Sequence, residues 1–185
     1  MRNHDLPMVR PRLLQPALLC SICLLLALPA AAQPTGVILP AVTGIQGERV
    51  STDLVLEDAP GITGITLEIG FDAALVLPDE TLIMGPLGQS VQNIHGANVV
   101  GGDTLRVAVA TFGDTVGYVG SGILLTIDWD LIGAGTTPLE FLSILLEDNT
   151  GVLPADPTNG SIEAEPAPVD PTTWGTLKTH YESNP

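Results

Sequence analysis

From Ile65 to Phe71 an apolar residue occupies every second position, with polar or small residues between. This period of two is typical of a β-strand with one face on a hydrophobic core and the other in water. Phe71-Asp72 ends the pattern, and the Asp72 carboxylate is suited to accept a hydrogen bond from the turn that follows. The stretch Gly61–Leu75 is therefore predicted to contain the central strand of the fold.

Short apolar or alternating segments recur along the rest of the chain, separated by Gly, Pro, Asn and Asp. Further strands are predicted at 37–42, 50–56, 75–77, 81–84, 104–111, 123–131, 139–146 and 160–164, with a weakly patterned segment at 89–100. Residues 57–61 are predicted as a loop because they include Pro60 and Gly61, and Gly101-Gly102-Asp103 is predicted as a hairpin turn. Eight or nine short strands with regular turns and no convincing helix predict an all-β sandwich.

The first 32 residues have the composition of a secretory signal peptide. Arg2, Arg10 and Arg12 precede a mostly apolar run at 13–28, and Ala30-Ala31-Ala32 offers a small-residue cleavage site. Both cysteines lie inside this segment, so the mature chain is predicted to have no disulfide. We expect a product without a membrane span that is secreted, extracellular or at the cell surface.

Composition divides the remainder into a sandwich domain at 33–164, a Pro-rich linker at 165–171 and a short amphipathic tail at 172–185. After removal of 1–32, three basic and twenty acidic residues leave a formal charge of −17. Such a charge would repel nucleic acid and anionic lipid, so neither is expected as a partner.

The tail places Trp174, Leu177 and Tyr181 at i, i+3 and i+7 on one side of a short predicted helix. A helix of this length is marginal alone, so it needs a surface on which to pack. Two interpretations remain open: packing on its own sandwich, and recognition by an export or surface-attachment system.

No catalytic or metal-binding constellation stands out. Asp128 and Asp130 share one strand face, but Ca²⁺ takes six to eight oxygen ligands, so a solvated face is favoured. The loop at 147–151 lacks the spacing of an EF-hand, and His95 is the one histidine of the domain. Carboxylates are plentiful but none is singled out as a glycosidase pair, and we expect no enzymatic activity and no cofactor.

Carbohydrate binding would favour a row of exposed aromatic rings on which sugars stack. Trp129 and Phe71 fall on the inward positions of their strands. Phe112 and Tyr118 are predicted to be open to solvent but do not form a row. Binding of a polysaccharide is therefore kept as an alternative.

Four segments in a fixed order carry a resemblance to a known family. They are Val42-Thr43-Gly44 followed by 47–50, the central stretch that ends in Phe71-Asp72, 121–127, and 159–162. Together they resemble a cohesin domain, a β-sandwich module that binds dockerin domains in cellulosomes and in other exported proteins. The resemblance covers roughly residues 38–164 and implies a nine-stranded jelly roll related to several carbohydrate-binding modules.

The resemblance also implies a binding surface. Cohesins bind dockerin on one flat sheet face, through the third, fifth and sixth strands. Carried over by position, that face here comprises Thr66, Glu68, Arg106, Ala108, Ala110, Leu124 and Thr126. An Asn and an Asp that bond dockerin in well-studied members align with Gly64 and Thr66, which implies that this recognition is altered or lost.

Three functions follow as hypotheses. The first is an exported, non-catalytic and monomeric module that docks a dockerin-like protein, with calcium supplied by the partner. The second is a carbohydrate-binding module. The third is a structural cell-surface component attached or sorted through its C-terminal tail.

Overall fold

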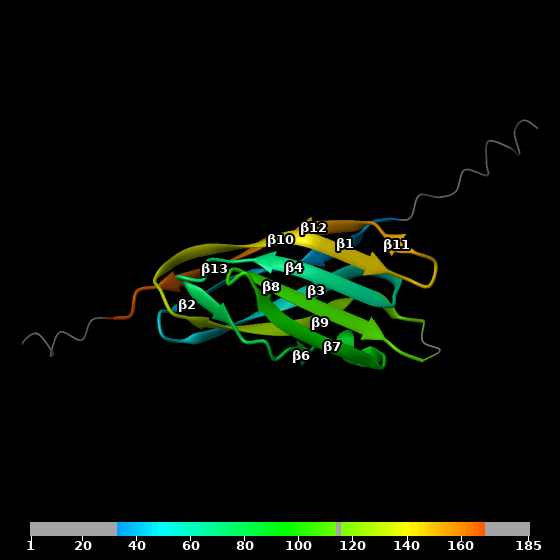
Figure 1. Ribbon diagram of the computed structural model, residues 1–185, viewed down its shortest axis with the longest axis horizontal. Coiled ribbons are helices and arrows are strands. Elements are labelled where there is room, and N and C mark those ends of the chain that lie inside the picture. The colour runs from blue at the N-terminus through cyan, green and yellow to red at the C-terminus, as the bar shows by residue number, and fades with distance from the viewer. Residues whose placement is uncertain (1–32, 114–115, 169–185) are drawn as a thin grey trace, which may run out of the picture. The chain divides into compact units, whose positions relative to one another are not determined.

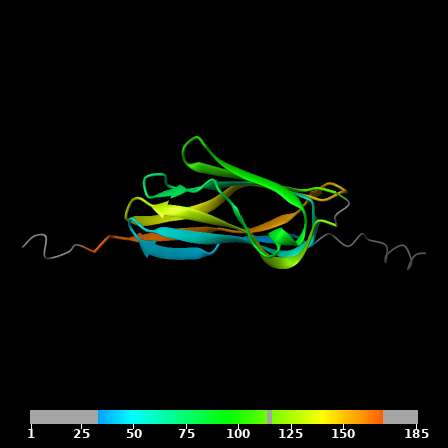
Figure 2. The ribbon, with the colours of Figure 1, turned by 90° about the horizontal axis from the view of Figure 1, so that it is seen from below.

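A computed structural model describes residues 33–113 and 116–168, which form two β-sheets packed face to face (Figure 1). Seen from below, the β7–β8 hairpin in green lies on the side of the molecule opposite the blue and cyan strands of the N-terminal part (Figure 2). The predicted signal peptide, the end of the linker and the tail with Trp174, Leu177 and Tyr181 lie outside the described residues.

The first sheet has six strands in the order β12-β1-β3-β9-β5, with β6 also pairing to β9. Its strands are β1 (Thr35–Ile38), β3 (Arg49–Ile62), β5 (Val76–Pro78), β6 (Ile83–Met84), β9 (Tyr118–Leu131) and β12 (Ala155–Thr158). β1 pairs with β12 in parallel, and the long β3 and β9 pair antiparallel along most of their length. This sheet closes one side of the sandwich.

The second sheet has seven strands in the order β2-β13-β10-β4-β8-β7, with β11 also pairing to β10. Its strands are β2 (Ala41–Ile45), β4 (Gly64–Gly70), β7 (Asn93–Val100), β8 (Thr104–Thr111), β10 (Gly135–Glu147), β11 (Val152–Leu153) and β13 (Gly160–Glu165). One 3₁₀ turn, η1 (Gly88–Ser90), is the helical element of the described residues, and none of them forms a helix long and apolar enough to cross a membrane. The predicted all-β sandwich of jelly-roll type is confirmed. Residues 33–113 and 116–168 contain thirteen strand segments, because several are only two to four residues long.

The alternation of the central strand is borne out. Ile65, Leu67 and Ile69 of β4 are each at most 2% exposed, while Thr66 and Glu68 lie on the other side. The first sheet meets them with fully buried residues of β3 and β9, among them Leu54, Leu56, Leu125, Ile127 and Trp129. The core thus lies between the two sheets, where the inward residues of β3, β4, β8, β9 and β10 are largely buried.

The predicted turns also form. The Asp72 Oδ1 accepts a hydrogen bond of 2.9 Å from the Ala74 N–H, so Asp72 closes the turn after Phe71. Phe71 is buried, and its ring lies 5.5 Å from that of Trp129 in an edge-to-face arrangement. Gly101 and Gly102 join β7 to β8 at φ values of 68° and 93°, which glycine adopts without strain.

Two predicted boundaries are wrong. The single strand predicted at 37–42 is two strands, β1 and β2, which lie in different sheets on either side of Leu39-Pro40. Pro40 lacks an N–H donor, which suits a break between ladders.

The loop predicted at 57–61 lies within β3. The β3–β9 register shifts between Leu56 and Ala59 and again between Pro60 and Ile62, so the breaker residues occupy bulges in a continuous strand. Asp58 has a φ of 55°, and Gly61 one of 125°.

Truncation of Leu67, which is fully buried, is expected to destabilise the fold by about 2–5 kcal/mol as Leu67→Ala, because it leaves a cavity. Ile94→Ala, at a side chain that is 69% exposed, is expected to cost less than about 0.5 kcal/mol. Urea unfolding of both variants measures the difference. Equal costs would contradict the assignment of Ile94 to an open surface.

Candidate functional site

The outward side of β10, β4, β8 and β7 forms a continuous exposed surface, here called the four-strand face. Residues directly opposite each other on neighbouring strands share a side of the sheet, so the ladder registers define its members. From β10 to β7 the rows are Glu147–Gly64–Ala110–Ile94, Leu145–Thr66–Ala108–Gly96 and Ser143–Glu68–Arg106–Asn98. Five of the predicted partner-binding residues lie together here: Thr66, Glu68, Arg106, Ala108 and Ala110.

Apolar side chains are exposed at several points of this face. Ile94 is 69% exposed and Leu145 is 36% exposed, and they stand on either side of the small residues at its centre. Leu142 occupies an irregularity in β10 between Phe141 and Ser143 and lies over Gly70. The face therefore combines apolar side chains with small ones that leave the backbone accessible.

One ion pair crosses the face. The Arg106 Nη2 and Nε atoms donate to Glu68 Oε1 at 2.6 and 3.0 Å. Glu140 and Glu147 flank this pair on β10 and form no ion pair with any described residue. The charge left on the face is negative.

Leu124 and Thr126 do not belong to this face, which corrects the prediction that placed all seven residues together. Both lie on β9, in the first sheet. Thr126 points to the outer side of that sheet, where its hydroxyl donates to Asp53 Oδ1 at 2.6 Å.

Leu124 is not exposed at all. The β3–β9 register shifts between Leu54 and Val55, so Leu124 has no residue opposite it and departs from the alternation. Gly88 lies directly against the Leu124 carbonyl oxygen, where a Cβ would clash. The η1 segment therefore covers this part of β9, which a pattern of alternation does not reveal.

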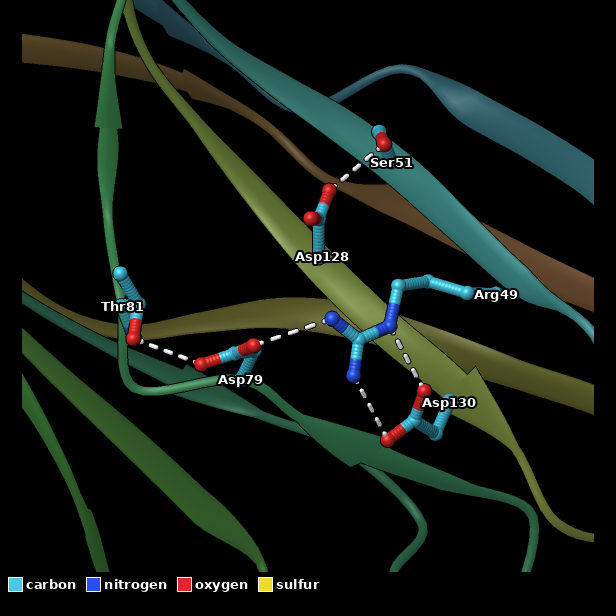
Figure 3. A network of polar contacts seen from close by, with 6 residues as sticks. All are labelled: Arg49, Ser51, Asp79, Thr81, Asp128 and Asp130. Carbon is cyan, nitrogen blue, oxygen red and sulfur yellow. Dashed lines mark hydrogen bonds and ion pairs between the residues drawn. The ribbon is translucent and has the colours of Figure 1, made fainter.

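The outer side of the first sheet is occupied by its own polar network (Figure 3). Arg49 donates to both carboxylate oxygens of Asp130, at 2.8 and 3.1 Å, and to Asp79 at 3.1 Å. Beside them, Ser51 donates to Asp128 at 2.6 Å. The Asp128 and Asp130 carboxylates considered above for calcium are thus engaged by protein donors.

These contacts shift the pKa values of Arg49, Asp79 and Asp130. The hydrogen bond and charge of Arg49 lower the pKa of Asp130, while hydrogen bonds from the backbone and side chain of Thr81 are the main cause that lowers the pKa of Asp79. Asp130 in turn raises the pKa of Arg49. The network therefore favours the ionised form of all three groups.

The described residues hold no cluster of three His, Cys, Asp or Glu side chains arranged for a metal ion. In the loop after β10, Asp148 Oδ1 accepts from the Thr150 hydroxyl and N–H and from the Gly151 N–H, which lowers the pKa of Asp148. This carboxylate closes its own turn. His95 is exposed on β7 and bonds to Asn93.

Aromatic residues do not gather on the surface that the structure describes. Tyr118, predicted to be open to solvent, is fully buried, and burial raises its pKa to about 12. Phe71 and Trp129 are buried as predicted, whereas Phe112 is 52% exposed.

Sequence reasoning missed the contributions of β10 and β7 to the four-strand face. Ser143 and Leu145 lie beside β4, and Ile94 and Asn98 lie beside β8. Pairing across strands that are distant in sequence determines these neighbours. The apolar Ile94 and Leu145 on outward positions were the available signal, since they break the polar pattern expected of a solvated face.

Comparison with solved structures identifies the fold. The chain is similar to a non-cellulosomal cohesin from Archaeoglobus fulgidus, with 17% identity over 83% of this chain and 100% of that one, and a TM-score of 0.61. It is also similar to a structure from a type I cohesin–dockerin complex of Clostridium thermocellum, Coh-OlpA–Doc918, with 19% identity, 71% and 99% coverage and a TM-score of 0.61.

A third similar structure is that of the sixth cohesin of Acetivibrio cellulolyticus scaffoldin B, solved with a mutant Cel5 dockerin. It shares 18% identity over 72% of this chain and 100% of that one, with a TM-score of 0.61. No protein-family model and no curated protein matches the chain. The chain has the cohesin fold, as the resemblance of its sequence implied.

The Arg49 network generates a prediction about pH. A carboxylate whose folded pKa is depressed adds stability above its unfolded pKa, about 3.9, and that stability is lost as the pH falls through the folded pKa. Arg49→Met is therefore expected to lower the melting temperature slightly at pH 7 and to have no effect once Asp79 and Asp130 are protonated. Circular dichroism melts from pH 7 to pH 2 measure this. A difference in melting temperature between Arg49→Met and the unaltered chain that stays constant with pH would show that the carboxylates are not coupled to Arg49.

Proposed function

We propose that this chain is an exported, non-catalytic protein-binding module that docks a dockerin-like partner on the four-strand face. The observation that carries the proposal is the exposure of Ile94 and Leu145 on a sheet face in a chain with the cohesin fold. Two of the similar cohesins described above were solved with dockerins. The module acts as a monomer that is secreted or held at the cell surface.

The face is suited to docking because it is formed before the partner arrives. Its residues stand on four adjacent strands. The other sides of β10, β4 and β8 are largely buried, with Leu67, Val107 and Leu146 fully inaccessible, and β7 at the edge is held by its ladder to β8. Side chains on such strands are held in place by the core beneath them. Binding therefore requires little change of the backbone.

The outer side of the first sheet is less suited to docking a partner than the four-strand face is. Arg49, Asp79 and Asp130 satisfy one another, and Ser51 and Asp128 do the same. A partner that docked there would have to displace these contacts, although Leu77 and Ile83, opposite Asp130 and Thr126, are exposed on this side as well. The two outer surfaces of the sandwich thus differ in how many internal contacts a partner would have to break.

Polysaccharide binding stays as the alternative, and the arrangement of aromatic residues does not favour it. Of the aromatic side chains of the described residues, Phe71, Tyr118 and Trp129 belong to the core, Phe141 is partly buried and Phe112 is exposed. Recognition of Trp174, Leu177 and Tyr181 by a surface-attachment system stays a prediction for residues beyond those described.

Ala108 lies at the centre of the face, so Ala108→Arg places a long charged side chain where a partner must approach. With the full chain as bait, exported proteins of the source organism are expected to yield a dockerin-bearing protein that is captured in calcium and released by a chelator. Ala108→Arg is expected to reduce capture by at least about tenfold. Quantitative mass spectrometry of the bound fraction is the measurement.

Ala134→Arg is the matched control, because Ala134 is exposed on the turn between β9 and β10, away from the rows of the face. The Ala134→Arg variant is expected to capture the same amount of partner as the unaltered chain does. Equal capture by the Ala108 and Ala134 variants would show that the partner docks elsewhere. Capture of polysaccharide alone would favour the alternative.

A further inference from the structure

A hollow lies within the four-strand face, at the end nearer the β4 N-terminus. It has a volume of about 390 Å³, and its floor is made by residues with at most a methyl side chain, Gly64, Gly96, Ala108 and Ala110. Ile94 and Thr66 stand at its sides. The ladders place Ala110 directly between Gly64 and Ile94, and Ala108 between Thr66 and Gly96, so the small residues are contiguous across three strands.

The size of the hollow fits one large side chain. An apolar cavity of about 150 Å³ in a protein accommodates a benzene molecule. The hollow of about 390 Å³ therefore has room for a leucine, methionine or aromatic side chain with part of the backbone that carries it. Its small residues bring such a side chain into contact with the sheet itself.

The rim of the hollow is negatively charged. The Glu147 carboxylate lines it, and its Oε2 extends over Gly64, 3.3 Å from the position that a Cβ at Gly64 would take. Glu68 is already paired with Arg106, one row further along β4. Glu147 is thus the carboxylate beside the hollow that is open to a cation from a partner.

The dimensions of the face fit a helix. Strand spacings of about 4.8 Å put β10 and β7 about 14 Å apart, and a helix with its side chains is about 10–12 Å across. On a helix, residues three or four positions apart stand on one side, about 5–6 Å from each other. One turn of helix can therefore place an apolar side chain in the hollow and a basic one toward Glu147.

We propose that the hollow over Gly64, Gly96, Ala108 and Ala110 receives one large apolar side chain from a partner helix, with a Lys or Arg one turn away facing Glu147. This inference rests on the proposed function and specifies the partner: a helix that is apolar at one position and basic three or four positions from it. A strongly acidic chain is suited to such a partner, since its field attracts basic segments.

The probe for this proposal is a displayed library built on a stable three-helix bundle, because isolated short helices are marginal. Residues on one side of one helix are randomised, and the library is selected on the full chain and counter-selected on Ala108→Arg. Enriched sequences are expected to carry Leu, Met, Phe, Tyr or Trp at one position, with Lys or Arg three or four positions away.

Filling the hollow tests where the apolar side chain binds. Ala110→Leu is expected to weaken the selected binders by at least about thirtyfold, and Gly96→Val to weaken them as well. Gly96 has nothing within 4 Å of an added Cβ, so this second variant is not expected to disturb the fold. Ala134→Leu, on an exposed turn, is the matched control and is expected to leave affinity unchanged.

The role of the Glu147 charge is tested by reversing the charges of Glu147 and of the basic residue on the binder. Glu147→Lys is expected to weaken binding about tenfold, and a binder in which the basic residue is replaced by Glu is expected to recover affinity for this variant. Glu57→Lys, at an exposed position of β3 in the first sheet, is the control.

The outcomes separate this inference from the proposed function. Binders that are lost on Ala108→Arg yet tolerate Ala110→Leu, Gly96→Val and Glu147→Lys would overturn the inference and leave the docking face in place. Capture of no dockerin-bearing protein by the full chain, or equal capture by Ala108→Arg, would overturn the proposed function whatever the library yields. A selection without enrichment over the counter-selection would overturn the inference, while calcium-dependent capture of a dockerin-bearing protein would still support the proposed function.

Discussion

The structure depends on the period-two register of β4 within its sheet. Ile65, Leu67 and Ile69 fill the core from one side of this strand, and a shift of one residue would turn them all toward solvent. The same register places Thr66 beside Ala108 and Glu68 beside Arg106. The constraint that builds the core therefore also determines which side chains meet on the outer surface.

From this constraint follows a difference between the two sides of the sandwich. On the first sheet, Arg49 joins Asp79 and Asp130, so charged groups meet partners within the chain. On the second sheet, Ile94 and Leu145 stand exposed around small residues, and Glu147 is open. Leu77 and Ile83 are exposed on the first sheet as well, so the difference between the two sheets lies in the hollow of small residues and in the Glu147 carboxylate of the second, which forms no ion pair with any described residue. This asymmetry supports a docking role for the second sheet, although the chain shares at most 19% identity with the cohesins described above.

Local pattern predicted much of the fold. Alternation identified β4 and β8, and residue types identified the turns at Asp72 and at Gly101-Gly102, because these features depend on neighbours in sequence. Local pattern gave wrong predictions where tertiary contacts determine strand boundaries and burial. The bulges of β3 absorb Pro60, and a covering segment buries Leu124, so neither is visible in alternation. Five residues of the site were predicted from positions on β4 and β8 that the cohesin resemblance carried over. Leu145 and Ile94 were missed because their place depends on the pairing of β10 with β4 and of β7 with β8.

The central claim is that a partner docks on the four-strand face, and the most direct measurement is amide NMR of the isotope-labelled full chain as the captured partner is added. The account predicts that the amide signals of Thr66, Arg106 and Ala108 shift, while those of Ser51 and Asp128 on the first sheet do not. Shifts confined to Ser51, Asp128 and their neighbours would place the partner on the opposite side and contradict the account.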